Sequence, residues 1–379
     1  MQCDTICVHG GDKPELVTGA VTTPIFQTST YVQDAPGKPR VYDYARAGNP
    51  TRTALEEALA AIEQGGKHAI TFASGLAATQ AIVQLLDSGD RVLVCEDVYG
   101  GTGRMFDKLF AKYGIEFIFV DMRNVSAVAE LVNAKTRMFW IESPTNPLLH
   151  VIDIAALTAL AKQHDILTVV DNTFASPLCQ SPLQLGADLV LHSTTKYIGG
   201  HSDLVGGAVI TADDHLAERL KFLQFAAGAV NAPIECYLLL RSLKTLAVRM
   251  QKHQHNAMMI AQALEQEQAF SAVVYPGLPS HPQHALASQQ MVNGFSGIIS
   301  LRLRGGKAAT YKFMQNLKLI KLAESLGGVE SLINHPETMT HASVPAARRK
   351  TLGITSDLVR LSVGIENHAD LLADIRASL

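Results

Sequence analysis

A lysine that follows a buried strand is the first candidate for chemistry in this sequence. Lys196 stands in the segment HSTTKYIGGHSD, among hydroxyl residues and glycines, directly after the apolar run ADLVL. Burial lowers the pKa of a lysine and makes its amine a nucleophile toward carbonyl groups, so the position predicts a Schiff-base lysine. The spacing Ser193-x-x-Lys196 also matches the serine β-lactamase pattern, but the accompanying Ser-Asp-Asn and Lys-Thr-Gly motifs are missing.

Two further strand ends carry polar groups that complement this lysine. The run LTVVD ends in Asp171, which could be a helix N-cap or the partner of a buried cation. The run AITFA ends in Ser74-Gly75-Leu76, where free backbone N–H groups at a helix start would suit an anion. An aldehyde cofactor with a phosphate and a pyridine ring needs a lysine, an acid for the ring nitrogen and an anion site. Ser193 and Thr195 would complete that anion site.

Seven short apolar runs predict the strands that position these residues. They alternate with stretches of helical spacing, which is typical of a largely parallel sheet buried on both faces. Ligands of such sheets bind beyond the carboxyl ends of the strands. We therefore expect an α/β fold with a large, mostly parallel, seven-stranded sheet. The runs occupy residues 69–73, 91–95, 116–121, 137–141, 167–171, 187–191 and 207–210.

The rest of the chain predicts an arm and a second, smaller domain. Residues 1–55 show no lasting periodicity and indicate an N-terminal arm, and residues 56–250 hold the cofactor-binding α/β domain. Helical spacing continues from about residue 212 to 268; there His253 and His255 fall on different helix faces, so we expect them at a solvated edge rather than on a metal. Residues 251–379 mix strand-like and helical runs, which predicts a C-terminal α+β domain.

Composition narrows the class of protein. The 379 residues are 47% hydrophobic and only 18% charged, which excludes intrinsic disorder. There are 32 Lys and Arg against 35 Asp and Glu, so no basic excess is available for nucleic acid. The sequence has no apolar run of about 18 residues, its first residues lack the apolar stretch typical of a secretory signal, and we expect no disulfide framework from its five scattered cysteines. We expect a cytoplasmic protein with neither a membrane span nor a metal site.

Ordered segments along nearly the whole chain resemble one family. They are VTTPIFQTSTY, YDYARAGNPTR, FASGLAAT, DVYGGTGR, ESPTNP, VVDNTF, HSTTKYIGGHSD, AESLGGVESL, THAS and LVRLSVGIE. The sequence is similar to the Cys/Met-metabolism enzymes of the fold-type I pyridoxal 5′-phosphate (PLP) group, which include cystathionine γ-lyase, γ-synthase and β-lyase. The resemblance implies the PLP-dependent transferase fold, PLP as cofactor, an amino-acid substrate, and a homotetramer built from dimers that share active sites.

The resemblance also implies roles for individual side chains. Lys196 binds PLP covalently, Asp171 pairs with the pyridine nitrogen, and Tyr99 stacks on the ring and assists catalysis. Arg360 clamps the substrate α-carboxylate, for which a guanidinium is suited. The implied cofactor-binding residues are Gly75, Leu76, Tyr99, Asp171, Ser193, Thr195 and Lys196, with Tyr44 and Arg46 reaching the neighbouring subunit's cofactor. The implied substrate-binding residues are Asn146, Arg104, Glu324, Ser325 and Arg360.

Local departures within the family favour one reaction. Methionine γ-lyase-like enzymes carry cysteine at the position of Gly101, so the glycine here argues against methionine as the substrate. Glu324 before Ser325 resembles γ-lyases and γ-synthases more than enteric β-lyases. We therefore predict γ-elimination of L-cystathionine to cysteine, 2-oxobutyrate and ammonia, with γ-synthase and β-lyase as alternatives. An aminotransferase with the same lysine, acid and arginine, and an inactive interaction protein that kept the fold, are the hypotheses from other classes.

Overall fold

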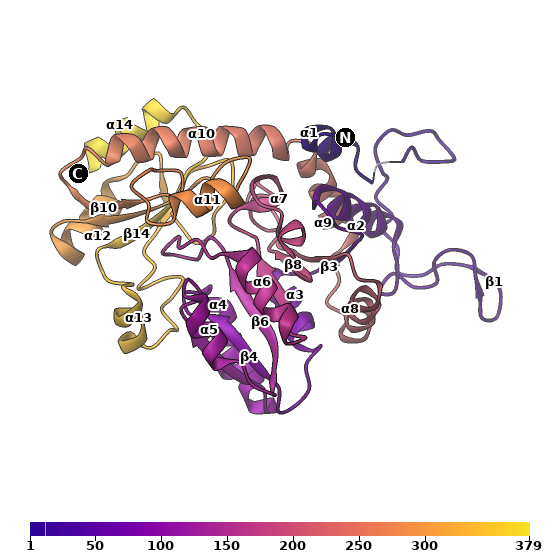
Figure 1. Cartoon of the computed structure of the whole chain (residues 1–379). Coiled ribbons are helices and arrows are strands. Elements are labelled where there is room, and N and C mark those ends of the chain that lie inside the picture. The colour runs from indigo at the N-terminus through magenta and orange to yellow at the C-terminus, as the bar shows by residue number, and fades with distance from the viewer. Residues whose placement is uncertain (12) are drawn as a thin grey trace.

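A seven-stranded mixed sheet forms the centre of the larger part of the chain (Figure 1). The computed structural model describes residues 1–11 and 13–379. Strand β9 runs antiparallel to the other six strands of this sheet. The predicted sheet is confirmed, and each of the seven apolar runs forms one strand. In spatial order the strands are β3 (His68–Phe72), β9 (Gly207–Thr211), β8 (Leu189–His192), β7 (Leu167–Asp171), β6 (Thr136–Glu142), β4 (Arg91–Cys95) and β5 (Glu116–Val120).

Helices cover both faces of this sheet, as its continuous apolar strands require. Successive side chains of a strand point to opposite faces. Val169 of β7 accordingly packs with α3 (Gly75–Val83) and α8 (Asp214–Ala227), whereas Val170 packs with α5 (Val125–Leu131) and α6 (Ile154–Gln163). Shorter helical segments are α4 (Gly100–Met105), a π-helical turn (Phe106–Phe110), 3-10 turns (Ala111–Tyr113 and Pro182–Leu185) and α7 (Ser176–Cys179).

A smaller five-stranded sheet organises the C-terminal part. Its core packs α10 (Leu246–Leu264), α12 (Gly306–Asn316) and α14 (His368–Ser378) against β11 (Ile298–Leu303) and β14 (Leu358–Ser362). The spatial order is β10 (Phe270–Val274), β11 (Ile298–Leu303), β14 (Leu358–Ser362), β13 (Leu332–Asn334) and β12 (Lys321–Leu322), with only β12 and β13 pairing in parallel. The helices of this part are α11 (His284–Gln290), α12 (Gly306–Asn316), α13 (Ala346–Leu352) and α14 (His368–Ser378).

The predicted helical stretch between the two sheets forms two helices after α8. They are α9 (Pro233–Leu243) and α10 (Leu246–Leu264), and α10 runs from α1 to α14 (Figure 1). The expectation of a solvated edge is wrong for His253, which is fully buried; its Nδ1 lies 2.7 Å from the carbonyl oxygen of Val363. Burial lowers the pKa of His253 to about 4, so a neutral ring fits this site. His255 is exposed as expected.

The N-terminal segment combines a packed helix with an extended stretch. Helix α1 (Cys3–His9) places Cys7 in the core beside α2 (Pro50–Ile62) and α10. The following chain carries the short hairpin β1 (Gln33–Ala35) and β2 (Lys38–Pro39), and it extends away from the body of the molecule (Figure 1). Along it, Leu16 is 99% exposed and Val17 is 90% exposed. The division into domains at residues 55 and 250 stays a prediction.

Within the described residues, no helix is long and apolar enough to cross a membrane.

Candidate active site

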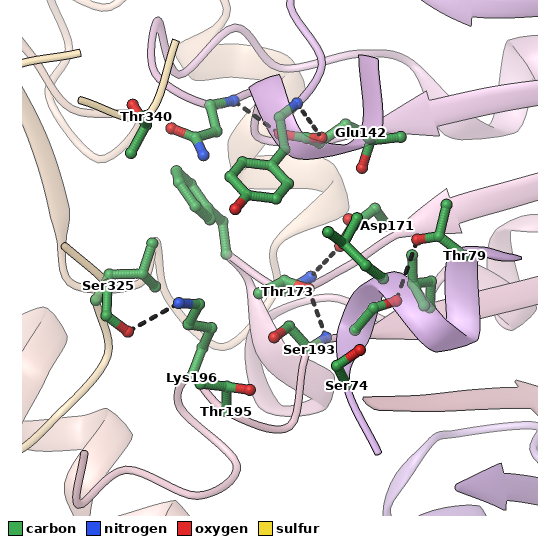
Figure 2. A pocket seen from close by; sticks show the side chains of 18 of the residues that line it. Ser74, Thr79, Glu142, Asp171, Thr173, Ser193, Thr195, Lys196, Ser325 and Thr340 are labelled. Atoms are coloured by element: carbon green, nitrogen blue, oxygen red, sulfur yellow. Dashed lines mark hydrogen bonds between the residues drawn. The ribbon is translucent and has the colours of Figure 1, made fainter. Parts of the chain in front are cut away.

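The strand ends singled out in the sequence converge on one cavity of about 250 Å³ (Figure 2). It lies beyond the carboxyl ends of β7 and β8, next to the start of α3, and residues of the C-terminal part close its other side. Among the residues predicted to form the site, those that line the cavity are Gly75, Leu76, Tyr99, Asn146, Asp171, Ser193, Thr195, Lys196, Glu324, Ser325 and Arg360.

The start of α3 forms one end of the cavity. Ser74 caps the helix, because its Oγ accepts the backbone N–H of Ala77 at 3.0 Å. The backbone N–H groups of Gly75 and Leu76 have no hydrogen-bond partner within the described chain, as expected at a helix start. A Cβ at position 75 would lie 3.0 Å from Cβ of Ser193, so glycine lets the helix start approach Ser193 closely. These free donors suit a phosphate group.

Asp171 offers a carboxylate on the strand side of the cavity. Its Oδ1 accepts the backbone N–H of Thr173 at 3.0 Å, and the Thr173 hydroxyl accepts the N–H of Ser193 at 2.9 Å. Burial raises the pKa of Asp171. A buried carboxylate is costly without a cationic partner, so the position fits an acid that pairs with a protonated ring nitrogen. Thr195, by contrast, already donates its hydroxyl to the carbonyl of Gly206 at 3.2 Å.

Lys196 meets the C-terminal part across the cavity. Its Nζ donates a hydrogen bond of 2.8 Å to Oγ of Ser325 (Figure 2). Burial, and secondarily the charge of Arg360, lowers the pKa of Lys196 to about 8. A substantial neutral fraction therefore exists near physiological pH, which gives the amine the nucleophilicity that the sequence predicts.

Arg360 of β14 presents a buried guanidinium to the same cavity. Its Nη1 donates to Oδ1 of Asn146 at 2.9 Å, and its Nη2 donates to the carbonyl of Ser325 at 2.8 Å. Burial lowers the pKa of Arg360 to about 10, so the group stays charged. The buried Nε has no partner among the described residues. An unpaired donor on a buried cation suits a carboxylate ligand.

Glu142 lines the cavity although the sequence analysis assigned it no role. It ends β6 as Asp171 ends β7, and the two residues are direct neighbours in the parallel register. Its Oε2 accepts the backbone N–H of Tyr99 and its Oε1 that of Asn146, both at 2.9 Å. The signal that could have found it was present: an acid ends the apolar run 137–141, as another ends 167–171.

Three predicted site residues do not line this cavity. Arg104 is exposed and borders a neighbouring hollow. Tyr44 is 45% exposed. Arg46 donates to the carbonyl of Phe225 at 2.7 Å and stacks over the Phe225 ring, with Cζ 4.5 Å from the ring centre. Any contact of Tyr44 or Arg46 with a cofactor in a second subunit remains a prediction.

Comparison with known proteins identifies the family of this chain. Residues 4–379 match the family model described as Cys/Met metabolism PLP-dependent enzyme. The chain belongs to this family. Its cofactor is therefore PLP, and the cavity fits it: the helix start would hold the phosphate, Asp171 the ring nitrogen and Lys196 the aldehyde carbon.

Relatives of this PLP-dependent enzyme carry three different names. Cystathionine beta-lyase of Coxiella burnetii is 51% identical over 99% of this chain and 97% of its own length. Cystathionine gamma-synthase of Mycobacterium leprae is 49% identical over 99% of this chain and 96% of its own. Cystathionine gamma-lyase of Dictyostelium discoideum is 50% identical over 99% and 97%. Sequence identity therefore establishes the family without separating the three reactions.

Solved structures agree with the fold. The crystal structure of metB from Corynebacterium glutamicum superposes with a TM-score of 0.97 at 47% identity, covering 100% of this chain and 98% of that one. Cystathionine gamma-lyase from Lactobacillus plantarum, complexed with L-serine, gives the same TM-score at 45% identity and the same coverage. The predicted fold-type I architecture is thus confirmed for this PLP-dependent enzyme.

Proposed function

We propose that this enzyme cleaves L-cystathionine by γ-elimination, using water and releasing cysteine, 2-oxobutyrate and ammonia. The observation that carries the proposal is Glu324, an exposed carboxylate on the cavity lining directly before Ser325. In γ-elimination the leaving sulfur is bonded to the γ-carbon, whereas in β-elimination it is bonded to the β-carbon. The leaving half in γ-elimination therefore lies one carbon farther from the α-carbon and from Lys196. Glu324 supplies a negative charge for the ammonium of that half.

Residues of the chain have distinct tasks in this reaction. PLP, when bound, accepts into its ring the electron pair left when a proton leaves the substrate α-carbon. Arg360 binds the α-carboxylate through its unpaired Nε and orients the α-proton toward Lys196. The amine of Lys196 would take this proton as a general base, for which a pKa of about 8 is suitable.

Tyr99 is the proposed acid for the leaving sulfur. It is 37% exposed at the start of α4, and burial is the main cause that raises its pKa. The phenol is therefore protonated at neutral pH and can donate to the departing thiolate. Its flat ring also suits stacking on an electron-poor cofactor ring.

Identifying the keto acid formed from L-cystathionine tests the proposed reaction. We expect 2-oxobutyrate and cysteine in equal amounts. Pyruvate without 2-oxobutyrate would instead establish β-elimination, and condensation of an O-acylhomoserine with cysteine as the main activity would establish γ-synthase. Both alternatives draw support from the names of the relatives.

The role of Glu324 has its own test. Glu324→Gln should raise KM for L-cystathionine about tenfold, because the ammonium of the leaving half loses its charged partner. Glu337→Gln, which removes an acid that does not line the cavity, should leave KM unchanged. Equal KM values for Glu324→Gln and the wild type would argue against this recognition.

A homotetramer with shared active sites, in a reducing cytoplasm, is part of the proposal. The exposed apolar arm and the position of Arg46 outside the chain's own cavity support a second subunit. The five free cysteines support a reducing compartment.

Shared sites can be tested at Arg46. Arg46→Ala should weaken PLP retention. Mixed dimers of Arg46→Ala and Lys196→Ala chains should regain activity, because one of their two sites is intact. No recovery under conditions that form mixed dimers would contradict shared sites.

A further inference from the structure

Glu142 connects two segments of the active site through its two carboxylate oxygens. Oε2 accepts the N–H of Tyr99, which precedes α4, and Oε1 accepts the N–H of Asn146, in the turn that follows β6 (Figure 2). We propose that Glu142 is a positioning residue. It holds the segment of Tyr99 against that of Asn146 and, through Asn146, orients the guanidinium of Arg360 in the cavity. The proposal depends on the carboxylate-binding role of Arg360 but not on which sulfur substrate is used.

Burial makes Glu142 an expensive residue at this place. Its side chain is 4% exposed, and its neighbour across the strands is a second acid, Asp171. Burial, with the charge of Asp171 as the next cause, raises the pKa of Glu142 well above its ordinary range. Such a group is retained only where its hydrogen bonds compensate, and here both bonds go to backbone N–H groups of the site.

Both oxygens of Glu142 are needed, because each accepts one N–H. Glutamine has nearly the same shape but only one oxygen, so its NH₂ group would face one of the two donors. Either the Tyr99 segment or the Asn146 segment would lose its contact. The arrangement therefore requires an acid at this position and not merely a polar side chain.

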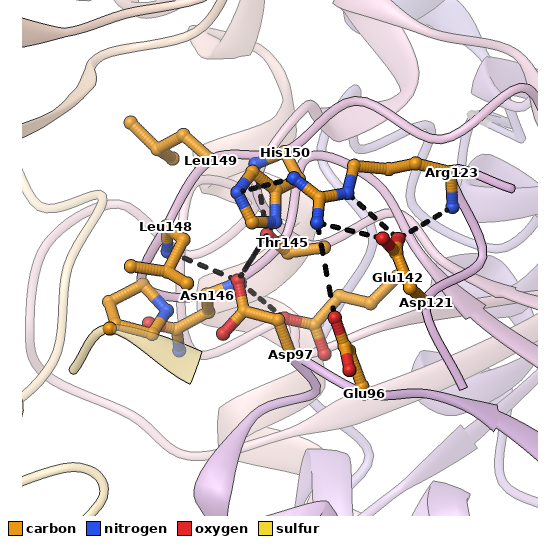
Figure 3. Close-up of polar contacts among 12 residues, drawn as sticks. Glu96, Asp97, Asp121, Arg123, Glu142, Thr145, Asn146, Leu148, Leu149 and His150 are labelled. Carbon is orange, nitrogen blue, oxygen red and sulfur yellow. Dashed lines mark hydrogen bonds and ion pairs between the residues drawn. The ribbon is translucent and has the colours of Figure 1, made fainter. Parts of the chain in front are cut away.

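A second buried acid, Asp97, holds the same turn at two other residues (Figure 3). Oδ2 of Asp97 accepts the Thr145 hydroxyl at 2.5 Å and the N–H of Leu148 at 3.3 Å. The Thr145 hydroxyl in turn accepts the N–H of His150 at 3.0 Å. Asp97 thus holds the turn at 145 and 148, whereas the N–H of Asn146 between them is held by Glu142.

The outer end of this network reaches the surface at Arg123 (Figure 3). Arg123 donates to Nε2 of His150 at 3.1 Å and pairs with Asp121 at 2.8 Å. Because Nε2 of His150 accepts from a cation, the proton of the neutral ring is on Nδ1, 3.9 Å from Asp97. Burial, together with Arg123, lowers the pKa of His150 to about 4, which agrees with a neutral ring.

One hydrogen bond links this turn to the arginine proposed to bind the substrate carboxylate. Oδ1 of Asn146 lies 2.9 Å from Nη1 of Arg360, so a shift of the Asn146 backbone moves an acceptor of the carboxylate-binding group. Among the described residues, the amine of Lys196 donates its hydrogen bond to Ser325 and not to this turn. Loss of Glu142 should therefore weaken carboxylate binding while cofactor attachment persists.

Glycine is the probe for this test, because it carries an α-carboxylate and no leaving group. The binding of glycine does not depend on which of the three reactions the enzyme catalyses, so this test stands even if the proposed γ-elimination is wrong. Its dissociation constant is measured from the change in visible absorbance of the PLP-loaded enzyme. Glu142→Gln should bind glycine about tenfold more weakly, because the Asn146 segment that positions Arg360 is no longer held, while it retains bound PLP.

Glu56→Gln is the matched control. Glu56 is half-buried and accepts the N–H and hydroxyl of Thr71 and the amide of Gln224, but all three bonds go to Oε1. Glutamine can keep those bonds, and Glu56 does not line the cavity. Glycine affinity of this variant should match the wild type.

A double-mutant cycle separates positioning from general loss of stability. Asn146→Ala removes the acceptor of Arg360, so adding Glu142→Gln to it should weaken glycine binding far less than Glu142→Gln does alone. Additive losses in the cycle, or wild-type glycine affinity in the PLP-loaded Glu142→Gln enzyme, would overturn the proposal.

Discussion

The amine of Lys196 and the hydroxyl of Ser325 are joined by a 2.8 Å hydrogen bond although 129 residues separate them in the chain. The bond crosses the cavity from the loop after β8 to the segment between β12 and β13. Ser325 also accepts Nη2 of Arg360 with its carbonyl. One residue of the C-terminal part therefore orients both the amine and the guanidinium of the site.

Ser325 has a backbone φ of 87°, a left-handed conformation that residues with a Cβ rarely adopt. Ser325→Ala and Ser325→Gly both remove the hydroxyl that holds Lys196, so kcat/KM should fall by a similar factor, about tenfold, in both. Only glycine relieves the backbone strain. We expect Ser325→Gly to be more stable than Ser325→Ala by up to about 1 kcal/mol in thermal unfolding, even after its extra unfolded-state entropy. A less stable glycine variant would contradict strain at this residue.

The lowered pKa of Lys196 predicts how cofactor capture depends on pH. Only the neutral amine attacks a carbonyl, so the rate at which apoenzyme binds PLP should rise with pH and level off above about 8. Stopped-flow absorbance measures this rate. A midpoint near the pKa of a solvated lysine would show that burial does not act on this amine.

Arg360 is the second cause of that shift, because a nearby cation disfavours a protonated lysine. In Arg360→Met the pKa of Lys196 should rise, and the midpoint of cofactor capture should move to higher pH. Arg376→Met, which removes an arginine from a surface pair with Glu267, should leave the midpoint unchanged. An unmoved midpoint in Arg360→Met would exclude this electrostatic coupling.

Gly75 is expected to be indispensable for tight PLP binding. A methyl group there would meet Cβ and Oγ of Ser193 at 3.0 and 3.1 Å, so the helix start or Ser193 must move. Gly75→Ala should raise the dissociation constant of PLP about tenfold or more in equilibrium dialysis. Gly103→Ala is the control, since its methyl would meet only Cγ1 of Val98, at an ordinary 3.7 Å. Similar PLP affinities for the two variants would refute the close approach.

Thr145 should contribute to stability through Asp97. The Oδ1 of Asp97 is buried without a partner among the described residues, and Thr145 is the closest donor to Oδ2. Thr145→Val keeps the shape but removes that donor, so unfolding should become easier by about 1–3 kcal/mol in denaturant titration. Thr351→Val, on the exposed face of α13, should change stability by less than about 0.5 kcal/mol. Equal effects of the two substitutions would mean that the Asp97 bond is not stabilising.

The sequence by itself determined the large sheet and the residues that we expect to bind the cofactor. Strands buried on both faces are continuously apolar, so each of the seven runs was visible locally. Parallel strands end at the same edge of a sheet, so polar residues at those ends had to meet there. Lys196, Asp171 and Gly75 were therefore predictable before any tertiary contact was known.

Only the tertiary structure decided which groups pair across the cavity. The hydrogen bond of Glu142 to the N–H of Tyr99 and the bond between Lys196 and Ser325 join segments distant along the chain, and no local pattern encodes such contacts. The same reason explains the error at His253, whose buried ring finds its hydrogen-bond partner at the carbonyl of Val363, 110 residues away. Periodicity reports which face of an element is apolar, whereas the partner that satisfies a buried polar atom is set by how the elements pack.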